Sequence, residues 1–293
     1  MRTVDTAVLP MAAAIDALEE ALRAGLDPEA DPPRTIVEVG AGQVAFMPAT
    51  SSHYAGVKLI TVAPGNAERN LPRVQGVYLL LDEATLSPLA LLDGAALTSL
   101  RTPAVSAVAV RHLSTVDSSR LLVFGTGPQA YGHVEAVRAV RPIAHVDVVG
   151  RRDGPIGDLV SWCRDAGLSA SAAAPDAVAR ADIVCCCTTA RVPLFDSALL
   201  PDHATVVAVG SHEPDAREVD AALVRRATTV VEARSAALRE AGDVIQAGTV
   251  PLATLDELVR GEVTVVPDRP RLFKSTGMAW EDLVVAAAAY ERR

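Results

Sequence analysis

Two lysines stand out in a chain that otherwise uses arginine as its cation. Of the 27 basic residues, only Lys58 and Lys274 are lysines, which leaves 25 arginines (27 − 2). Arginine does not lose its proton near neutral pH, whereas the pKa of a lysine ammonium responds to its surroundings. The two lysines therefore indicate positions where a compact or proton-exchanging ammonium is needed, and chance survival is the alternative.

A glycine-rich turn is the second feature with chemical meaning. Residues 121–130 form an apolar strand pattern, a G-x-G-x-x-A turn and the start of a helix. In that context Gly125 permits a tight turn, Gly127 lets the backbone approach a pyrophosphate, and Ala130 allows close packing of helix on strand. Pro128 suits the first helical turn, whose N-terminus attracts phosphate. The pattern predicts a Rossmann dinucleotide site; a structural turn of an unrelated α/β protein is the alternative.

The end of the next strand bears on the choice of cofactor. NAD sites usually place Asp or Glu there, roughly 20 residues further on, to bind the ribose hydroxyls. This chain instead has Arg151 and Arg152 after Val149-Gly150. Guanidinium groups suit a dianionic phosphate, so the sequence predicts a preference for NADP(H) over NAD(H). The alternative is that both arginines are solvated and Asp153 serves as the acid.

Composition limits the class of protein. Half of the 293 residues are hydrophobic, so two domains with sizeable cores are expected. A net charge of −9 without a basic run argues against nucleic acid as a partner. No apolar run reaches the ~18 residues that cross a bilayer. The cysteines, Cys163 and the run 185–187, lack metal-site or disulfide spacing, so we expect no metal and a cytoplasmic location.

The apolar pattern changes near residue 117. Before it, residues 8–24 and Leu97–Leu113 read as helices that flank short strands, expected to form a mostly antiparallel sheet. These strands are Thr35–Val39, Gln43–Met47, Gly56–Thr61, Gly76–Asp82 and Leu89–Asp93. After it, strands alternate with helices, which indicates βαβ units on a parallel sheet. The parallel strands are expected at Leu121–Phe124, Ala144–Val149, Ile183–Thr188, Thr205–Val209 and Thr228–Val231, with helices at Gly157–Ala166 and Trp280–Arg293.

Several further motifs follow one another along nearly the whole chain. They are Pro32-Pro33-Arg34, Phe46-Met47-Pro48, Gly56-Val57-Lys58, Arg101–Ala107, Gly125–Ala130, Pro214–Asp220 and Phe273–Asp282. In this combination the chain resembles the ornithine cyclodeaminase/mu-crystallin family, which includes cyclodeaminases, amino-acid dehydrogenases, ketimine reductases and a hormone-binding crystallin. The resemblance implies a homodimer with an α/β fold. A Rossmann domain of residues 117–274 would adjoin an α+β substrate-binding and dimerisation domain of residues 1–116 and 275–293, completed by the C-terminal helix.

The resemblance also implies roles for single residues. It places Arg34, Lys58 and Arg101 around the substrate carboxylate and the reacting carbon. A guanidinium is the bidentate partner for a carboxylate, and Lys58 could exchange a proton with the substrate nitrogen as the catalytic residue. The other expected substrate contacts are Gln75, His212 and Thr276. The expected cofactor contacts are Thr102, Gly125, Thr126, Gly127, Pro128, Gln129, Ala130, Arg151, Arg152, Thr188, Gly210, Ser211 and Lys274.

One position departs from the cyclodeaminase pattern. Ornithine cyclodeaminases carry an acidic residue shortly after the fifth Rossmann strand, and alignment on Gly210 and Pro214 places His212 there. We therefore predict an NADP(H)-dependent oxidoreductase that acts on the C=N or C–N bond of a small imino or amino acid. The alternatives are a cyclodeaminase-type ammonia lyase and a non-catalytic NADPH-dependent binding protein.

Overall fold

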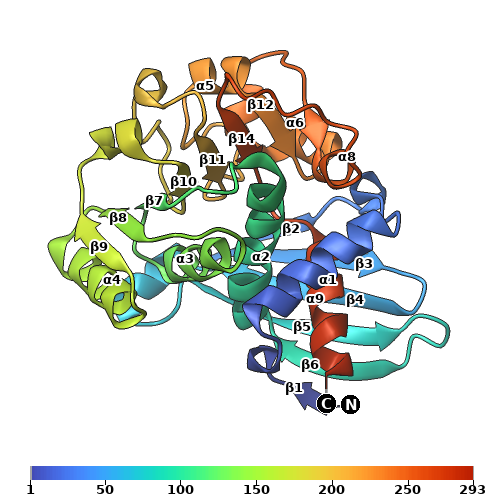
Figure 1. The fold of residues 1–293 in the computed structure, drawn as a ribbon. Coiled ribbons are helices and arrows are strands. Elements are labelled where there is room, and N and C mark those ends of the chain that lie inside the picture. The colour runs from blue at the N-terminus through green and yellow to red at the C-terminus, as the bar shows by residue number, and fades with distance from the viewer. Residues whose placement is uncertain (1, 293) are drawn as a thin grey trace.

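The N-terminal part of the chain forms a six-stranded sheet. A computed structural model describes residues 2–292 and shows two sheets joined by helices (Figure 1). The first sheet has the order β1-β6-β5-β4-β3-β2, antiparallel throughout except that β1 runs parallel to β6. Its strands are β1 (Arg2–Val4), β2 (Thr35–Val39), β3 (Gly42–Thr50), β4 (Tyr54–Val62), β5 (Val74–Asp82) and β6 (Pro88–Asp93).

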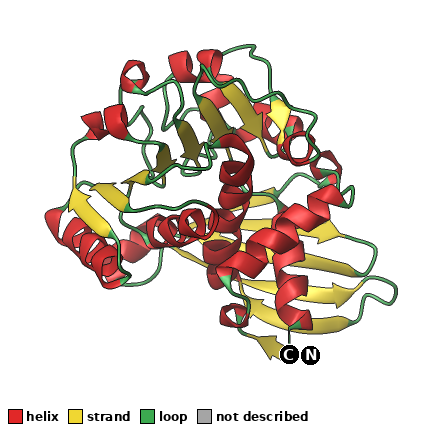
Figure 2. Ribbon diagram, viewed as in Figure 1, coloured by secondary structure: helices red, strands yellow, loops and turns green. Residues whose placement is uncertain are grey.

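Strand alternation gives this sheet a buried and an exposed face. Met47, Lys58, Tyr78 and Leu92 are aligned across neighbouring strands and are all buried. Helices α2 (Gly94–Leu113) and α9 (Ala279–Glu291) pack on this face, and α1 (Met11–Arg23) packs on those two helices (Figure 2). Because successive strand residues point to opposite faces, the next residues along each strand face away from the helices. Several of them are apolar and exposed, namely Val37, Val39, Phe46 and Val77.

The second sheet is parallel and carries the Rossmann strand order. Its order is β13-β12-β14-β11-β10-β7-β8-β9. The strands are β7 (Arg120–Phe124), β8 (His145–Val149), β9 (Ser169–Ala172), β10 (Ile183–Cys186), β11 (Thr205–Ala208), β12 (Thr228–Val231), β13 (Ala253–Thr254) and β14 (Arg271–Lys274). The chain order reverses between β7 and β10, and ligands of such sheets bind at that point, outside the carboxyl ends of the strands.

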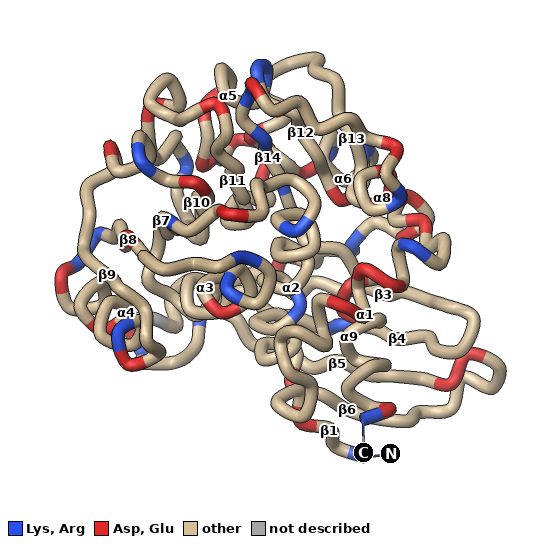
Figure 3. The backbone as a smooth tube through the Cα atoms, viewed as in Figure 1, with Lys and Arg blue, Asp and Glu red and all other residues tan. Residues whose placement is uncertain are grey.

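Short helices connect the parallel strands, and one long helix lies between the two sheets. The connecting helices are α3 (Pro128–Val140), α4 (Asp153–Asp165), α5 (Ala221–Arg226), α6 (Arg234–Glu240), α7 (Gly242–Ile245) and α8 (Leu255–Val259). The residues 101–110 of α2 are all buried, because this helix packs on β5, on α3 and on the end of β11. Figure 3 shows basic and acidic residues interspersed over both parts of the molecule. No helix within residues 2–292 combines the length and apolar character that a membrane crossing requires.

The structure confirms the predicted α/β fold and alters some element boundaries. The first long helix begins at Met11 instead of residue 8, because Pro10 separates it from a 3-10 turn at Thr6–Val8. The strand predicted to end at Thr188 ends at Cys186. The strand β9 (Ser169–Ala172) was missed, because its sequence Ser-Ala-Ser-Ala lacks the β-branched residues typical of strands. The domain boundaries at 116/117 and 274/275 stay a prediction.

Candidate functional site

The glycine turn after β7 leaves room for a phosphate-bearing ligand. Gly125 has φ +110°, and a Cβ there would lie 2.4 Å from the carbonyl oxygen of Cys187. At Gly127 a Cβ would meet no protein atom within 4 Å, so this backbone is open to a ligand. Helix α3 begins at Pro128 without a side chain capping its first turn. The turn therefore presents free N–H groups and the positive end of a helix, as a pyrophosphate requires.

Two exposed arginines follow the neighbouring strand β8. Arg151 and Arg152 are exposed, and within residues 2–292 neither forms an ion pair. Gly150 packs tightly beneath them, since a Cβ there would lie 2.9 Å from Ile156 and 3.0 Å from Thr126. Gly150, which directly precedes the two arginines, therefore lies close to Thr126 of the glycine turn.

Lys58 lies in a buried group of charges between the first sheet and two helices. Its side chain is 1% exposed, and its Nζ is 2.7 Å from Oδ2 of Asp282 and 3.3 Å from Oγ1 of Thr98. Arg101 contacts the other oxygen of Asp282 at 3.2 Å and Glu281 at 2.7 Å. The alternation of side chains along β4 places Lys58 on the buried face of the sheet. There it meets Thr98 from α2 and Asp282 from α9.

This environment sets the proton affinity of Lys58. Burial lowers the pKa of Lys58, and the negative charge of Asp282 raises it, while the nearby charge of Arg101 lowers it. The resulting pKa is about 8, which is well below the ordinary value for lysine. A lysine with this pKa exchanges its proton in the range where most enzymes work.

Glu232 ties the loop before α9 to the parallel sheet. It follows β12 directly, is buried, and accepts hydrogen bonds from the Ser275 hydroxyl at 2.6 Å and the Thr276 and Gly277 N–H groups at 2.8 and 3.1 Å. The carbonyls of Thr276 and Gly277 in turn accept from Nη2 of Arg34 at 2.9 and 2.7 Å. The loop therefore joins Arg34, which directly precedes β2, to the Rossmann sheet.

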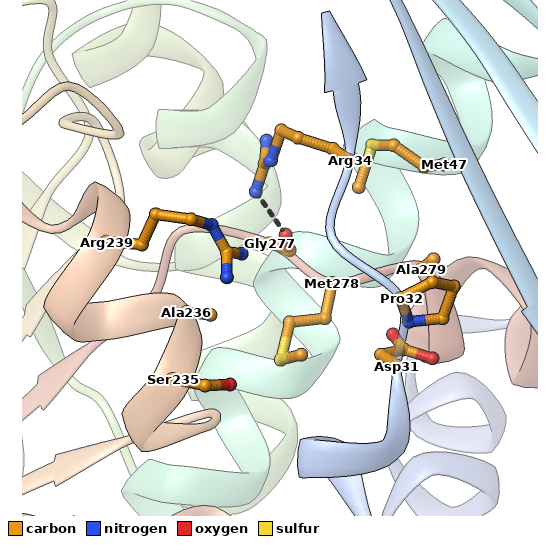
Figure 4. A pocket seen from close by; sticks show the side chains of 10 residues that line it. All are labelled: Asp31, Pro32, Arg34, Met47, Ser235, Ala236, Arg239, Gly277, Met278 and Ala279. Atoms are coloured by element: carbon orange, nitrogen blue, oxygen red, sulfur yellow. Dashed lines mark hydrogen bonds between the residues drawn. The ribbon is translucent and has the colours of Figure 1, made fainter.

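A pocket lies beside this loop, between residues of the first sheet and helix α6 (Figure 4). It is lined by Asp31, Pro32, Arg34, Met47, Ser235, Ala236, Arg239, Gly277, Met278 and Ala279. Arg34 forms an ion pair with Glu240 at 2.9 Å through the same Nη2 that contacts the loop. Burial raises the pKa of Asp31 to about 7, although backbone N–H groups at the start of α9 stabilise its charge. The pocket thus combines a cation with a carboxyl group that titrates near neutral pH.

Glu218 fastens two loops at the carboxyl edge of the parallel sheet. Its Oε1 accepts hydrogen bonds from the Thr188 N–H at 2.8 Å and the Thr188 hydroxyl at 2.7 Å, and its Oε2 accepts from the Gly210 N–H at 2.7 Å. Thr188 follows β10 and Gly210 follows β11. The donor groups of these two predicted cofactor residues are therefore engaged with Glu218.

Lys274 lies beneath the same loops. Its side chain is fully buried, donates to the carbonyl of Ser211 at 2.6 Å and is 3.1 Å from Asp243. The Ser211 hydroxyl donates to the carbonyl of Ala216 at 2.5 Å. Lys274 and Ser211 thus stabilise the loop after β11 from below.

The remaining predicted residues occupy different places. Gln75 is exposed on the outer face of the first sheet, opposite to the face that carries Tyr78, so the structure does not bring it to Lys58. His212 lies in the loop after β11, where partial desolvation and then the charge of Arg34 lower its pKa. Thr102 is buried in α2 beside Arg101. Gln129, at the start of α3, donates to the Thr98 carbonyl at 3.4 Å. It therefore links the glycine turn to Thr98, the residue whose hydroxyl contacts Lys58.

Comparison with known proteins decides the family. The model of the ornithine cyclodeaminase/mu-crystallin family matches residues 3–293. The chain belongs to this family. A ketimine reductase mu-crystallin from Rattus norvegicus is 34% identical over 89% of this chain and 84% of its own length.

Two solved structures show the same fold. A Thermococcus litoralis Delta(1)-pyrroline-2-carboxylate reductase, in complex with NADH and L-proline, has a TM-score of 0.92 at 30% identity, covering 100% of this chain and 97% of that one. An archaeal alanine dehydrogenase dimer with bound NAD has a TM-score of 0.92 at 30% identity, covering 100% and 96%. Within this family the chain is an NAD(P)-dependent oxidoreductase of small amino or imino acids.

The glycine turn offers a direct test of cofactor binding. We expect Gly127→Ala to fold normally, because no protein atom lies within 4 Å of the new Cβ, and to bind NADPH at least tenfold more weakly. The measurement is a fluorescence titration with NADPH. Gly157→Ala in α4, where a Cβ also meets nothing within 4 Å, is the matched control. Unchanged affinity in Gly127→Ala would place the pyrophosphate elsewhere.

Proposed function

We propose that the chain uses NADPH to reduce the C=N bond of a small imino acid, or oxidises the corresponding L-amino acid in the reverse direction. The observation that carries the proposal is the buried Lys58, with a pKa of about 8, beside a helix that contacts the glycine turn. The family's relatives include a ketimine reductase and a pyrroline-2-carboxylate reductase, which supports the same chemistry.

Lys58, Arg34 and Arg101 have different roles in this reaction. The nicotinamide cofactor, when bound, supplies the hydride that adds to the imine carbon. Lys58 donates a proton to the imine nitrogen and recovers it from solvent, so that one hydride and one proton convert C=N to CH–NH. A guanidinium must hold the substrate carboxylate, and we assign this role to Arg34 and Arg101. Arg34 keeps its Nε and Nη1 free of partners within residues 2–292, since its contacts there use Nη2.

The function is tested by following NADPH oxidation with a panel of cyclic and open imino acids. We expect turnover with at least one five- or six-membered cyclic imino acid. Tight ligand binding without turnover of any of them would instead support a non-catalytic binding protein. L-ornithine belongs in the same panel, because the family includes cyclodeaminases.

Ornithine cyclisation is disfavoured by the charges around His212. That reaction needs a group that attracts and deprotonates a second, cationic amine, which a carboxylate does well. His212 is held neutral at pH 7 and faces the positive charge of Arg34. We therefore propose the reductase or dehydrogenase over the ammonia lyase.

The preference for NADPH rests on Arg151 and Arg152. We expect the double variant Arg151→Ala/Arg152→Ala to bind NADPH about ten- to hundredfold more weakly, because hydrogen bonds to charged groups are worth about 1.5–3 kcal/mol. Its affinity for NADH should stay within about twofold. Both values come from fluorescence titrations at one fixed salt concentration, since the phosphate contact is sensitive to screening. An equal loss for both cofactors would contradict the assignment.

We further propose a homodimer formed through the exposed face of the first sheet. The support is the row of exposed apolar side chains on that face, defined above, and the dimeric state of the archaeal alanine dehydrogenase. Residues 1–116 and 275–293 would then bind the substrate and the partner subunit, and residues 117–274 the cofactor. The free cysteines fit a cytoplasmic location.

A further inference from the structure

One carboxylate in the buried charge group touches both cations. Oδ2 of Asp282 is 2.7 Å from Lys58, and Oδ1 of Asp282 is 3.2 Å from Nε of Arg101. Both side chains of the Lys58–Asp282 pair are buried, at 1% and 0% exposure. The adjacent Glu281 is equally buried and pairs with Arg101 instead of Lys58.

The geometry leaves Lys58 one free donor. An ammonium has three N–H groups, and within residues 2–292 Lys58 has Asp282 as its ion-pair partner and the Thr98 hydroxyl as its hydrogen-bond acceptor. The Thr98 hydroxyl donates its own proton to the carbonyl of Gly94 at 2.8 Å, so it accepts from Lys58. Two partners on α2 and α9 therefore fix the direction of the ammonium and leave one N–H for a substrate nitrogen.

We propose that Asp282 is a positioning residue of the reaction, which holds the Lys58 ammonium charged and oriented toward the substrate nitrogen. The inference rests on the proposed function, in which Lys58 is the proton donor. Asp282 acts through Lys58 and does not itself contact the reacting atoms.

The groups around Lys58 show why the charge of Asp282 is decisive. The titratable groups that face it are Tyr78 from β5, Arg101 from α2, Glu281 and Asp282 from α9, and Asp31 through its proximity to Tyr78 and Asp282. Asp282 and, more weakly, Glu281 raise the pKa of Lys58, and burial raises the pKa of Glu281 itself well above its usual range. Arg101 opposes a second positive charge nearby. Asp282 is therefore the main group that keeps Lys58 protonated.

The test compares two adjacent, near-isosteric substitutions. Asp282→Asn removes the carboxylate that contacts Lys58, whereas Glu281→Gln alters the neighbouring carboxyl, which contacts Arg101 and not Lys58. For each variant, kcat/KM of imine reduction is measured from pH 6 to 10 at saturating NADPH. In Asp282→Asn we expect the alkaline fall in rate to move about 1–2 pH units lower, because loss of a neighbouring opposite charge shifts a pKa by this amount. In Glu281→Gln the midpoint should move clearly less, because Glu281 raises the pKa of Lys58 less than Asp282 does.

A third variant separates the effect of the Asp282 charge on Lys58 from a loss of protein stability. Breaking a buried ion pair is strongly destabilising, so Asp282→Glu, which keeps the charge, should restore the wild-type midpoint even if its rate is lower. NADPH titration confirms that each variant is folded. An unshifted midpoint in Asp282→Asn, or an equal shift in Glu281→Gln, would overturn the role of Asp282. Absence of imine reduction in the wild-type protein would instead contradict the proposed function, and full turnover in Lys58→Met would contradict the role of Lys58 as proton donor, so these failures are distinguishable.

Discussion

Replacing Lys58 by arginine is expected to lower kcat of imine reduction about 10²- to 10⁴-fold, the range typical of a lost proton transfer. Arginine keeps the positive charge beside Asp282 but does not give up its proton near neutral pH. The affinity for NADPH should change less than about threefold, because Lys58 reaches the glycine turn only indirectly, through Thr98 and Gln129. Single-turnover mixing with NADPH and an imino acid measures the chemical step directly.

The larger arginine side chain could disturb a buried site, so Lys58→Met is the companion variant. Methionine matches the aliphatic length of lysine without its charge, and it leaves Asp282 paired with Arg101 alone. Both variants should lose most of the rate of imine reduction while retaining the NADPH fluorescence signal. Turnover of Lys58→Arg within a few-fold of wild type would show that Lys58 only balances charge.

The sequence carried enough information for the two-sheet fold and for the cofactor turn. Periodicity places the strands because burial on one face imposes an alternation that is visible in the residues themselves. The glycine turn was predictable because Gly125 meets a steric demand that no other residue satisfies, with its positive φ against Cys187. The scarcity of lysine also indicated two positions where the environment restricts the side chain. Lys58 and Lys274 are both fully buried beside acidic partners.

The acidic partners themselves were not predictable from local pattern. Asp282 and Glu281 stand at the start of a helix, where acidic residues are common simply because they favour the helix dipole. Glu232 and Glu218 follow or precede short elements and resemble solvated loop residues in the sequence. Their function depends on contacts with residues distant in the chain, which only the packing of α9 and the sheet reveals.

The dependence of kcat/KM on pH in the wild-type protein is expected to follow the protonation state of Lys58. With a pKa of about 8, Lys58 is protonated below that pH and neutral above it. Imine reduction needs the protonated form, so kcat/KM should be level on the acidic side and fall about tenfold per pH unit above pH 8. Between pH 7 and pH 10 the loss should reach about 100-fold. Oxidation of the amino acid needs the neutral form, so its kcat/KM should rise up to about pH 8 and then level off.

The two directions must be measured together, because the substrate nitrogen also titrates. A fall caused by the imine would persist in Lys58→Arg, whose guanidinium does not titrate in this range, whereas a fall caused by Lys58 would vanish from the residual activity of that variant. The expected result is therefore an alkaline limb near pH 8 in the wild type and a flat reduction profile in Lys58→Arg. If the limb remained in the variant at the same pH, the titrating group would belong to the substrate, and Lys58 would lose its assignment as the proton donor.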